Sequence, residues 1–233
     1  MTPERSQEKP SRGTLYIIGL PIGNPEDITL RALRLLRQAD VVATKEPRQT
    51  QTLLRHYGMR TVLTTYDRRN AQEKVPILMH HLMAGHSVAL VSTVGTPCLY
   101  DPGTRLVEHA HRAGISVVSV PGPSALTAAL AVAGMSADML YFGGRFPAGQ
   151  TAGMRLLVSI KDQGCTSIFF ILPERLRKGL ALWEKVLGNR DALIAVDLTK
   201  PTEHLLRGKI RTLLGTQPLR YLNADVTLVI AGR

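Results

Sequence analysis

Glycine and proline gather in three segments of this sequence, and their arrangement suits the binding of a small molecule. The segments are Gly19–Asp27, Ser92–Gly103 and Val120–Ala125; each follows a short apolar run and precedes a helix-like pattern. Glycine lets a ligand approach the backbone closely, whereas proline fixes the shape of a loop and removes competing donors. Such loops can hold an adenosine-like ligand by main-chain contacts, with a carboxylate near a helix N-terminus. We therefore expect a small-molecule site at these loops.

The elements that must position these loops follow from hydrophobic periodicity in the first half of the chain. Short β-branched runs alternate with longer amphipathic runs, and this order predicts a parallel sheet covered by helices. The expected strands are Leu15–Gly19, Val41–Thr44, Thr61–Thr64, Ser87–Val91 and Ser116–Val120, and the expected helices are Pro25–Gln38, Thr50–Tyr57, Ala71–Ala84 and Gly103–Ala113.

Two of these helices carry a local start signal. Asn24 is a good N-cap residue, Pro25 suits the first helical position, and acids follow where the helix dipole favours them. The second loop repeats the pattern, with Asp101 as the expected cap and Pro102 as the first helical residue.

The second half predicts another α/β domain of similar size. We expect a polar, disordered tail at residues 1–12, an N-terminal α/β domain at 13–120 and a C-terminal α/β domain at 121–233. Trp183 sits among apolar residues and is predicted to be core. The expected elements are helices at Ser124–Ala133, Thr151–Lys161, Pro173–Leu187 and Ile210–Leu214, strands at Met139–Phe142, Thr166–Leu172, Ala192–Leu198 and Asp225–Ala231, and a loop at Gly143–Gln150.

Several common site types are excluded by their missing motifs. The sequence has no P-loop, no Gly-x-Gly-x-x-Gly after a strand and no Gly-x-Ser-x-Gly elbow. Its two cysteines, Cys98 and Cys165, form neither a disulfide framework nor a metal cluster. The seven histidines show no zinc-type spacing, so no metal site is expected.

The charge favours a polyanionic partner. Lysine and arginine number 29 against 18 acids, which gives a net charge of +11. Such a balance suits nucleic acid, although a merely soluble basic surface gives the same number. Arg31, Arg34 and Arg37 fall on one side of the first helix, either as a solvated face or as a nucleic-acid contact. No apolar run is long enough to span a bilayer and no signal peptide is visible, so the expected location is cytoplasmic.

Long motifs then identify a resemblance. The chain resembles the tetrapyrrole methylase superfamily of S-adenosylmethionine-dependent methyltransferases, and within it the small-subunit ribosomal RNA cytidine 2′-O-methyltransferases. The matching segments, spread over nearly the whole chain, are Leu15–Leu33, Asp101–Gly103, Val120–Leu126, Leu198–Lys200 and Arg207–Gly208.

Other segments depart from the pattern of that family, mostly at polar positions. An expected Glu-Asp-Thr-Arg is Lys45–Arg48 here, and an expected Ser-Asp-Ala-Gly-Thr-Pro is Ser92–Pro97. The family's Tyr-Glu-Ser-Pro-His-Arg is replaced by Phe170–Arg175.

The resemblance implies S-adenosylmethionine as cofactor, lying between two α/β domains. It also implies ribosomal RNA or the small ribosomal subunit as partner, and a homodimer. The cofactor-binding residues carried over by the resemblance are Pro21, Gly95, Thr96, Leu99, Ser124, Ala125, Ile171 and Val196.

Methyl transfer to a ribose hydroxyl needs a base or a hydrogen-bonding relay, because that hydroxyl is a poor nucleophile. Acids expected at loop tips are Asp27, Glu46 and Asp101, of which Asp27 and Asp101 are also plausible helix-cap acids. Glu46 stands where the family has aspartate, and Arg48 matches the family's arginine and could hold an RNA phosphate.

Three functions stay open at this stage. The first is an RNA 2′-O-methyltransferase, which the long opening motif and the charge favour. The second is a catalytically degenerate binding protein of the same fold, which the altered acids favour. The third is a methyltransferase for a tetrapyrrole-like small molecule, whose acidic groups would also suit a basic protein.

Overall fold

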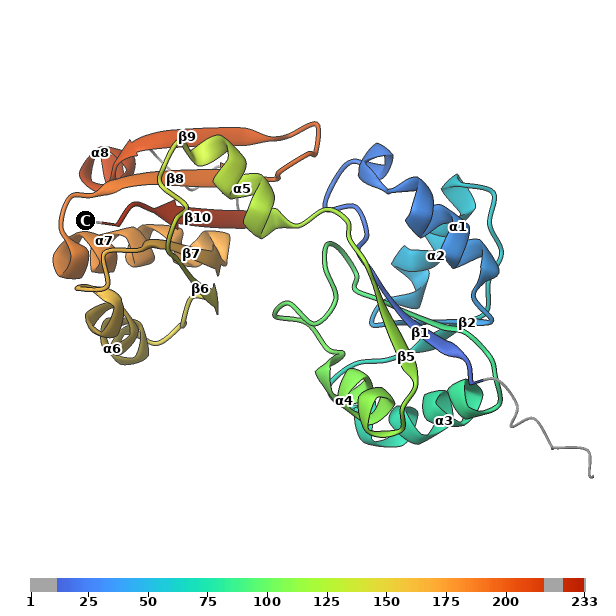
Figure 1. Cartoon of the computed structure of the whole chain (residues 1–233). Helices are drawn as coiled ribbons and strands as arrows, with labels where there is room; N and C mark the ends of the chain where they lie inside the picture. The colour runs from blue at the N-terminus through green and yellow to red at the C-terminus, as the bar shows by residue number, and fades with distance from the viewer. Residues whose placement is uncertain (1–11, 216–223, 233) are drawn as a thin grey trace, which may run out of the picture. The chain divides into compact units, whose positions relative to one another are not determined.

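The computed structural model describes residues 12–215 and 224–232, and the chain divides into two compact units. Within the described residues, unit 1 holds residues 12–21 and 25–123. Unit 2 holds residues 22–24 together with the described residues from 124 onward. Each unit is built around a sheet of its own (Figure 1).

The sheet of unit 1 is parallel throughout, as the alternating sequence pattern predicted. Its strand order is β3-β2-β4-β1-β5, and every pairing between neighbours is parallel. All five strands therefore end at the same edge, where the Gly/Pro loops follow. The strands are β1 Thr14–Ile18, β2 Val41–Thr44, β3 Leu63–Thr65, β4 Val88–Val91 and β5 Ser116–Val120.

Helices cover both faces of this sheet (Figure 1). On one face, α1 (Leu30–Gln38) and α2 (Pro47–His56) bury apolar side chains against Val42 and Ala89. On the other, α3 (Ala71–Met83) and α4 (Thr104–Arg112) pack against strand residues that include Leu15 and Leu90. Strands β2 and β4 are buried along their whole length, and such strands appear in a sequence as near-continuous apolar runs, which explains why these two could be predicted.

Both predicted cap assignments in unit 1 are wrong. Pro25–Asp27 forms only a single 3₁₀ turn, and α1 starts later, with Thr29 as N-cap accepting from the Ala32 N–H at 3.1 Å. Likewise the N-cap residue of α4 is Gly103 and not Asp101. Gly103 has a φ of 147°, so the backbone between Asp101 and the helix is not helical. Only glycine adopts that φ readily, so the backbone turns at this point instead of continuing as helix.

The sheet of unit 2 is mixed. Its strand order is β6-β7-β10-β8-β9; β6 pairs with β7 in parallel, and the other pairings are antiparallel. These strands are β6 Leu140–Arg145, β7 Thr166–Ile171, β8 Asp191–Val196, β9 His204–Lys209 and β10 Val226–Ile230.

Unit 2 has helices on both faces of its sheet as well. One face carries α5 (Ala125–Ala133), and the other carries the remaining helices around an aromatic cluster. Trp183 is fully buried, with its ring centroid 4.5 Å from that of Phe146, which confirms its predicted place in the core. The remaining helices are α6 Gln150–Ile160, α7 Leu176–Leu187 and α8 Ile210–Gly215, and a short 3₁₀ turn, η2 Pro173–Arg175, precedes α7.

Two features of this sheet were not predicted. Strand β9 lies at the edge of the sheet with mostly exposed side chains, so it lacks the apolar run that marks a buried strand. Strand β6 continues through Gly143 to Arg145, where a loop was expected, because the ladder shifts register after Phe142 and Gly144 takes a φ of 63°.

A three-residue segment from the first Gly/Pro loop belongs to unit 2. The Asn24 N–H donates to Thr199 Oγ1 at 2.9 Å, and Ile22 joins the apolar cluster beneath α5. A Cβ on Gly23 would lie 2.6 Å from the Leu198 carbonyl oxygen, so only glycine permits this approach.

Replacing Thr199 by valine should destabilise unit 2 by about 1–3 kcal/mol, because the partly buried Asn24 N–H then loses its acceptor. Thr199→Ser keeps the hydroxyl and should stay close to the parent. Urea unfolding followed by fluorescence of Trp183, the single tryptophan of the chain, reports on unit 2. Equal loss in both variants would show that this hydrogen bond contributes little.

Candidate functional site

Two of the Gly/Pro loops of unit 1 are joined by a pair of backbone hydrogen bonds. The Leu20 N–H donates to the Gly95 carbonyl at 2.9 Å, and the Gly95 N–H donates back to the Leu20 carbonyl at 3.0 Å. The Ser92 hydroxyl also donates to the Gly95 carbonyl, at 2.8 Å. Gly95 is buried with a φ of 72°, a conformation that favours glycine. The loops after β1 and β4 are therefore held as one piece.

The third loop joins the same structure. The Gly19 N–H donates to the Val120 carbonyl at 3.1 Å, and the Thr96 hydroxyl donates to the Pro123 carbonyl at 3.3 Å. A Cβ on Gly19 would lie 2.9 Å from the Cα of Gly122, so the two backbones meet where no side chain fits. We call the segments 19–21, 92–103 and 121–123 the loop rim. The predicted residues Pro21, Gly95 and Thr96 all lie in it.

The second half of the loop after β4 is held in a strained conformation. Cys98 and Tyr100 have φ angles of 66° and 59°, in the left-handed region, and Leu99 lies between them, half-buried. Such conformations cost free energy and persist only where the surroundings impose them. Here a Cβ on Gly103 would lie 2.8 Å from Leu90 Cδ2, so the end of the loop is pressed onto β4.

Asp101 is the half-buried acid of the loop rim. Burial raises the pKa of its carboxyl above the ordinary value, and the nearby charges of Lys45 and Arg68 offset part of that rise. These two cations come from the loops that follow β2 and β3. The Arg68 guanidinium also lies 5.9 Å from the centroid of the Tyr100 ring. A desolvated carboxylate with a raised pKa is a stronger base than an exposed one, so Asp101 can accept a proton.

The neighbouring thiol does not suit nucleophilic chemistry. Burial raises the pKa of Cys98, and the nearby Asp101 raises it further, so the thiolate is disfavoured.

The other two residues predicted to be catalytic lie in the open at the start of α2. Glu46 is exposed in the N-cap position, where its side chain makes no capping hydrogen bond. Arg48, the second residue of the same helix, is exposed as well. Both side chains are therefore accessible to a large ligand.

One carboxylate oxygen of Asp27 accepts no hydrogen bond from the described residues. This atom, Oδ2, is buried. Because Thr29 caps α1, the helix-cap role considered for Asp27 is wrong. A buried acceptor without a donor suits a site that a ligand completes.

The remaining four predicted cofactor residues belong to unit 2. Ser124 is buried in the N-cap position of α5 without a capping side-chain bond, and Ala125 is the first residue of that helix. Ile171 and Val196 lie on either side of Val226 in one row across the sheet, at the ends of β7 and β8. The structure thus brings this last pair together, with both side chains buried in the core cluster of unit 2.

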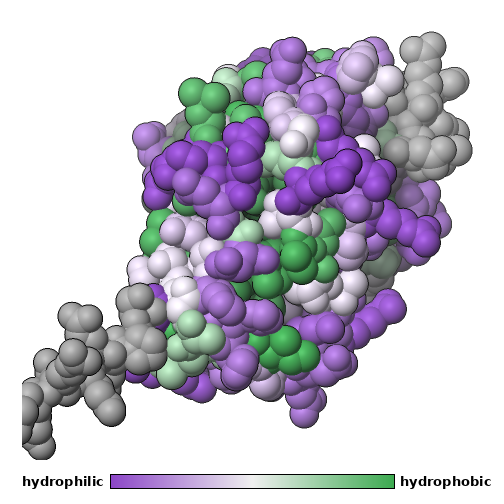
Figure 2. Space-filling model, turned by 90° about the vertical axis from the view of Figure 1, so that its right-hand side faces the viewer, coloured by the Kyte–Doolittle hydropathy of each residue, from purple (hydrophilic) through white to green (hydrophobic). Residues whose placement is uncertain are grey.

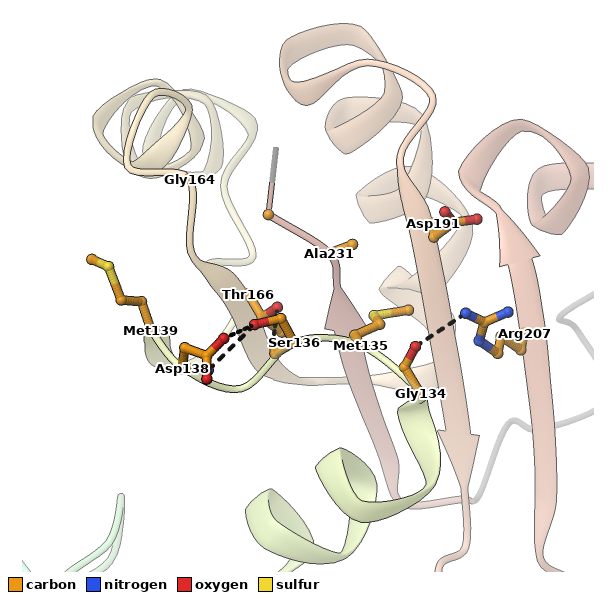
Figure 3. Close-up of a pocket in the computed structure, with 11 residues that line it drawn as sticks. Gly134, Met135, Ser136, Asp138, Met139, Gly164, Thr166, Asp191, Arg207 and Ala231 are labelled. Atoms are coloured by element: carbon orange, nitrogen blue, oxygen red, sulfur yellow. Dashed lines mark hydrogen bonds between the residues drawn. The ribbon is translucent and has the colours of Figure 1, made fainter.

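A cavity of about 390 Å³ lies at the opposite end of the unit 2 sheet, beside the start of β7 and the end of β10 (Figure 3). Its charged side chains already have hydrogen-bond or ion-pair partners within unit 2. Arg207 donates to the Ala133 and Gly134 carbonyls, Ser136 donates to Asp138, and Asp191 pairs with Lys209. We therefore do not assign the predicted chemistry to this cavity.

Hydrophilic side chains are spread over the face of the molecule drawn in Figure 2. Figure 2 shows the face of the molecule on the right of Figure 1, with hydrophobic side chains in several separate groups. Arg31, Arg34 and Arg37 of α1 are all exposed. In the described part of the chain, no helix combines the length and apolar character needed to cross a membrane.

Comparison with known proteins defines the family. The model of the Tetrapyrrole (Corrin/Porphyrin) Methylases matches residues 14–214. The chain therefore belongs to this methylase family, and the predicted resemblance is confirmed.

Within that family the sequence is similar to proteins named Ribosomal RNA small subunit methyltransferase I. The protein of that name from Thermotoga maritima is 38% identical over 221 residues, covering 95% of this chain and 99% of the relative. The one from Mesorhizobium japonicum is 43% identical over 206 residues, covering 88% and 70%.

Solved structures agree in fold. Cobalt precorrin-4 methyltransferase matches with a TM-score of 0.70 and 21% identity over 94% of each chain. Uroporphyrin-III-C-methyltransferase from Thermus thermophilus matches with a TM-score of 0.63 and 21% identity over the same shares. The predicted α/β, tetrapyrrole methylase-like fold class is thus confirmed.

Sequence reasoning missed the cationic surroundings of Asp101. Lys45 and Arg68 are far apart in the sequence, and only the parallel sheet brings the loops that carry them to one edge. The sequence offered one sign that they belong to the site: each comes shortly after a predicted strand.

Substituting Asp101 by asparagine should raise the melting temperature at pH 7. A raised folded-state pKa means that the charged carboxyl disfavours the folded state, and this penalty grows as pH rises above the unfolded value of about 3.9. The gain should therefore vanish near pH 3, where the carboxyl is protonated. Thermal melts followed by circular dichroism across this range measure it.

The matched control is Asp67→Asn. The backbone N–H of Asn70 lowers the pKa of Asp67 more than burial raises it, so this carboxylate stabilises the fold above its unfolded pKa and loses that effect as pH falls. Its substitution should lower the melting temperature at pH 7. A fall with Asp101→Asn as well would contradict the assigned burial of Asp101.

Proposed function

We propose that this protein is an S-adenosylmethionine-dependent methyltransferase that methylates a ribose 2′-hydroxyl in small-subunit ribosomal RNA. The observation that carries the proposal is similarity along the whole chain to ribosomal RNA small subunit methyltransferase I, at 38% identity over 99% of the Thermotoga relative. The loop rim of unit 1 supports it, because its three loops are locked together at the edge where a parallel sheet binds ligands.

The residues of the loop rim, together with Asp27 at the end of the first Gly/Pro segment, fit S-adenosylmethionine. This cofactor carries an ammonium group and ribose hydroxyls as donors, and the buried Oδ2 of Asp27 is an acceptor without a donor. Gly95 offers a backbone that no side chain shields, and Thr96 offers a hydroxyl. We propose that Pro21, Gly95, Thr96 and Leu99 hold the cofactor from unit 1. The four predicted residues of unit 2, named above, remain proposed contacts.

When bound, S-adenosylmethionine supplies an electrophilic methyl group. The protein must align the acceptor hydroxyl with it and remove the hydroxyl proton. Asp101 is the best placed of the three acids for the second task, because its pKa is raised by burial. Lys45 and Arg68 offset part of that rise in pKa and offer positive charge to an RNA phosphate. Exposed Glu46 and Arg48 are proposed to contact the RNA acceptor.

The charge of the protein suits this substrate. A net charge of +11 attracts a polyanion over long range, and arginine can bind phosphate in a bidentate manner. We propose a cytoplasmic location, which suits an RNA substrate of this kind. We also propose a homodimer; light scattering that shows a monomer at micromolar concentration would contradict this part alone.

Calorimetry with S-adenosylmethionine and S-adenosylhomocysteine is the first test. We expect saturable binding at one site per chain, and methyl transfer to the 2′-hydroxyl of RNA in undermethylated small ribosomal subunits. Gly19→Ala should weaken the binding of both ligands, because its Cβ would force the backbone at Gly122 away. Absence of binding with or without RNA would instead favour a catalytically degenerate relative.

Arg48→Ala should weaken binding to small ribosomal subunits about tenfold, since hydrogen bonds to charged groups contribute roughly 1.5–3 kcal/mol. Affinity for S-adenosylmethionine should stay nearly unchanged. Arg55→Ala removes the same charge from the far end of α2 and serves as the control. Equal loss of RNA and cofactor affinity in Arg48→Ala would show that Arg48 is structural.

A further inference from the structure

Unit 2 contains a cavity of about 570 Å³ that none of the predicted site residues lines. One wall is the loop from Phe146 to Gln150, at the start of α6. The other wall is one side of α7 and the residue before it. All of its lining residues belong to unit 2, whereas unit 1 forms the loop rim.

The wall along α7 is cationic. Arg175, Lys178 and Lys185 line the cavity, and no acid is among the lining residues that the structure describes. Lys178 and Lys185 are seven residues apart, so they project from nearly the same side of the helix, about 10 Å apart along its axis. Neither lysine forms an ion pair with another described residue. Their charges are therefore available to a ligand.

The opposite wall adds positive potential from the backbone. Helix α6 has eleven residues and begins at Gln150, and the preceding Gly149 provides no capping side chain. The first N–H groups of a helix and its dipole favour an anion. The Arg175 guanidinium donates to the Ala148 carbonyl at 3.4 Å, and this hydrogen bond connects the two walls of the cavity.

The cavity has a rigid floor. Phe146 is buried, with its ring centroid 5.4 Å from that of Phe169 and close to the Trp183 ring. A Cβ on Gly153 would lie 3.0 Å from Leu182 Cδ2, and one on Gly179 would lie 2.8 Å from Ile171 Cδ1. Gly153 lets α6 pack closely on α7, and Gly179 lets α7 pack closely on β7, so both walls are held in place.

The geometry points to a binding site for the phosphate backbone of RNA in this cavity. The inference rests on the proposed function and adds a substrate contact on unit 2, made by residues other than those proposed to take part in methyl transfer. The lysines span more than a single phosphate, and unpaired cations with a helix N-terminus match a phosphodiester chain. The whole-chain charge of +11 agrees with a polyanion, and an acidic protein segment is the less favoured occupant.

The test compares two double variants of the full chain. Lys178→Ala with Lys185→Ala removes two charges from the cavity wall. Arg155→Ala with Arg177→Ala removes two charges from exposed positions of the same two helices, outside the cavity. Filter binding to undermethylated small ribosomal subunits is measured at several salt concentrations, and S-adenosylmethionine affinity is measured by calorimetry.

We expect the cavity variant to lose at least tenfold in affinity for the subunit. Its slope of log affinity against log salt should fall by about 1.4, because each phosphate contact to a single strand contributes about 0.7. The control should change less than threefold. Both variants should keep the S-adenosylmethionine affinity and the Trp183 fluorescence of the parent, which shows that unit 2 is folded.

Other outcomes overturn the inference. Equal weakening by both variants would mean general charge attraction, and no weakening would mean that RNA does not use the cavity. If inorganic phosphate binds the parent but not the cavity variant, while subunit binding is unchanged, the cavity takes a small anion. If the parent protein binds S-adenosylmethionine but not the ribosomal subunit, the proposed RNA function is wrong. If the parent and both variants bind the subunit equally well, only the proposed RNA site in the cavity is wrong.

Discussion

The pair of backbone hydrogen bonds between Leu20 and Gly95 is the constraint on which the loop rim depends. It joins two loops that are far apart in sequence and fixes both backbones at the edge of a parallel sheet. It requires Gly95 in a left-handed conformation, with a φ of 72°. The contact of Gly19 with Gly122 then adds the third loop, at a distance that excludes any Cβ. A rim fixed by its main chain tolerates changes in side chains, which is consistent with the altered polar residues of this sequence.

Desolvation sets the direction of the pKa shift of Asp101, the half-buried acid of the loop rim. Asp101 lies near two cations, which alone would lower the pKa of its carboxyl, yet burial has the larger effect and the pKa is raised. The same loop holds Cys98 and Tyr100 in left-handed conformations. Buried charge and backbone strain both cost stability, and both occur in the loop that is proposed to meet the substrate. Their coincidence fits the general observation that strain collects at functional sites.

Much of the fold could be predicted, for identifiable reasons. Strands β2 and β4 of unit 1 are buried along their whole length and therefore appear as apolar runs, and glycine and proline mark the loops that follow β1, β4 and β5. Strand β9 was missed because its exposed edge carries no such run. Asn24 satisfies the local rule for a helix cap, but its N–H binds Thr199, 175 residues away, and no local rule contains that contact. The same limit applies to Asp101, because its pKa depends on Lys45 and Arg68, which only the folded sheet brings near it. The roles of the individual cofactor residues stay predictions.

The segment Ile22–Asn24 makes the two units topologically inseparable. The polypeptide passes from unit 1 to unit 2 before residue 22, returns after residue 24, and passes again after residue 123. A fragment that begins at Ser124 would lack Ile22 from its apolar cluster and Asn24 as the donor to Thr199. During synthesis, residues 22–24 leave the ribosome long before β8 and β10 exist, so the packing of unit 2 is completed only when the end of the chain reaches a segment made near its beginning. Folding of the two halves is therefore coupled through the chain itself, and cutting between them cannot yield two intact domains.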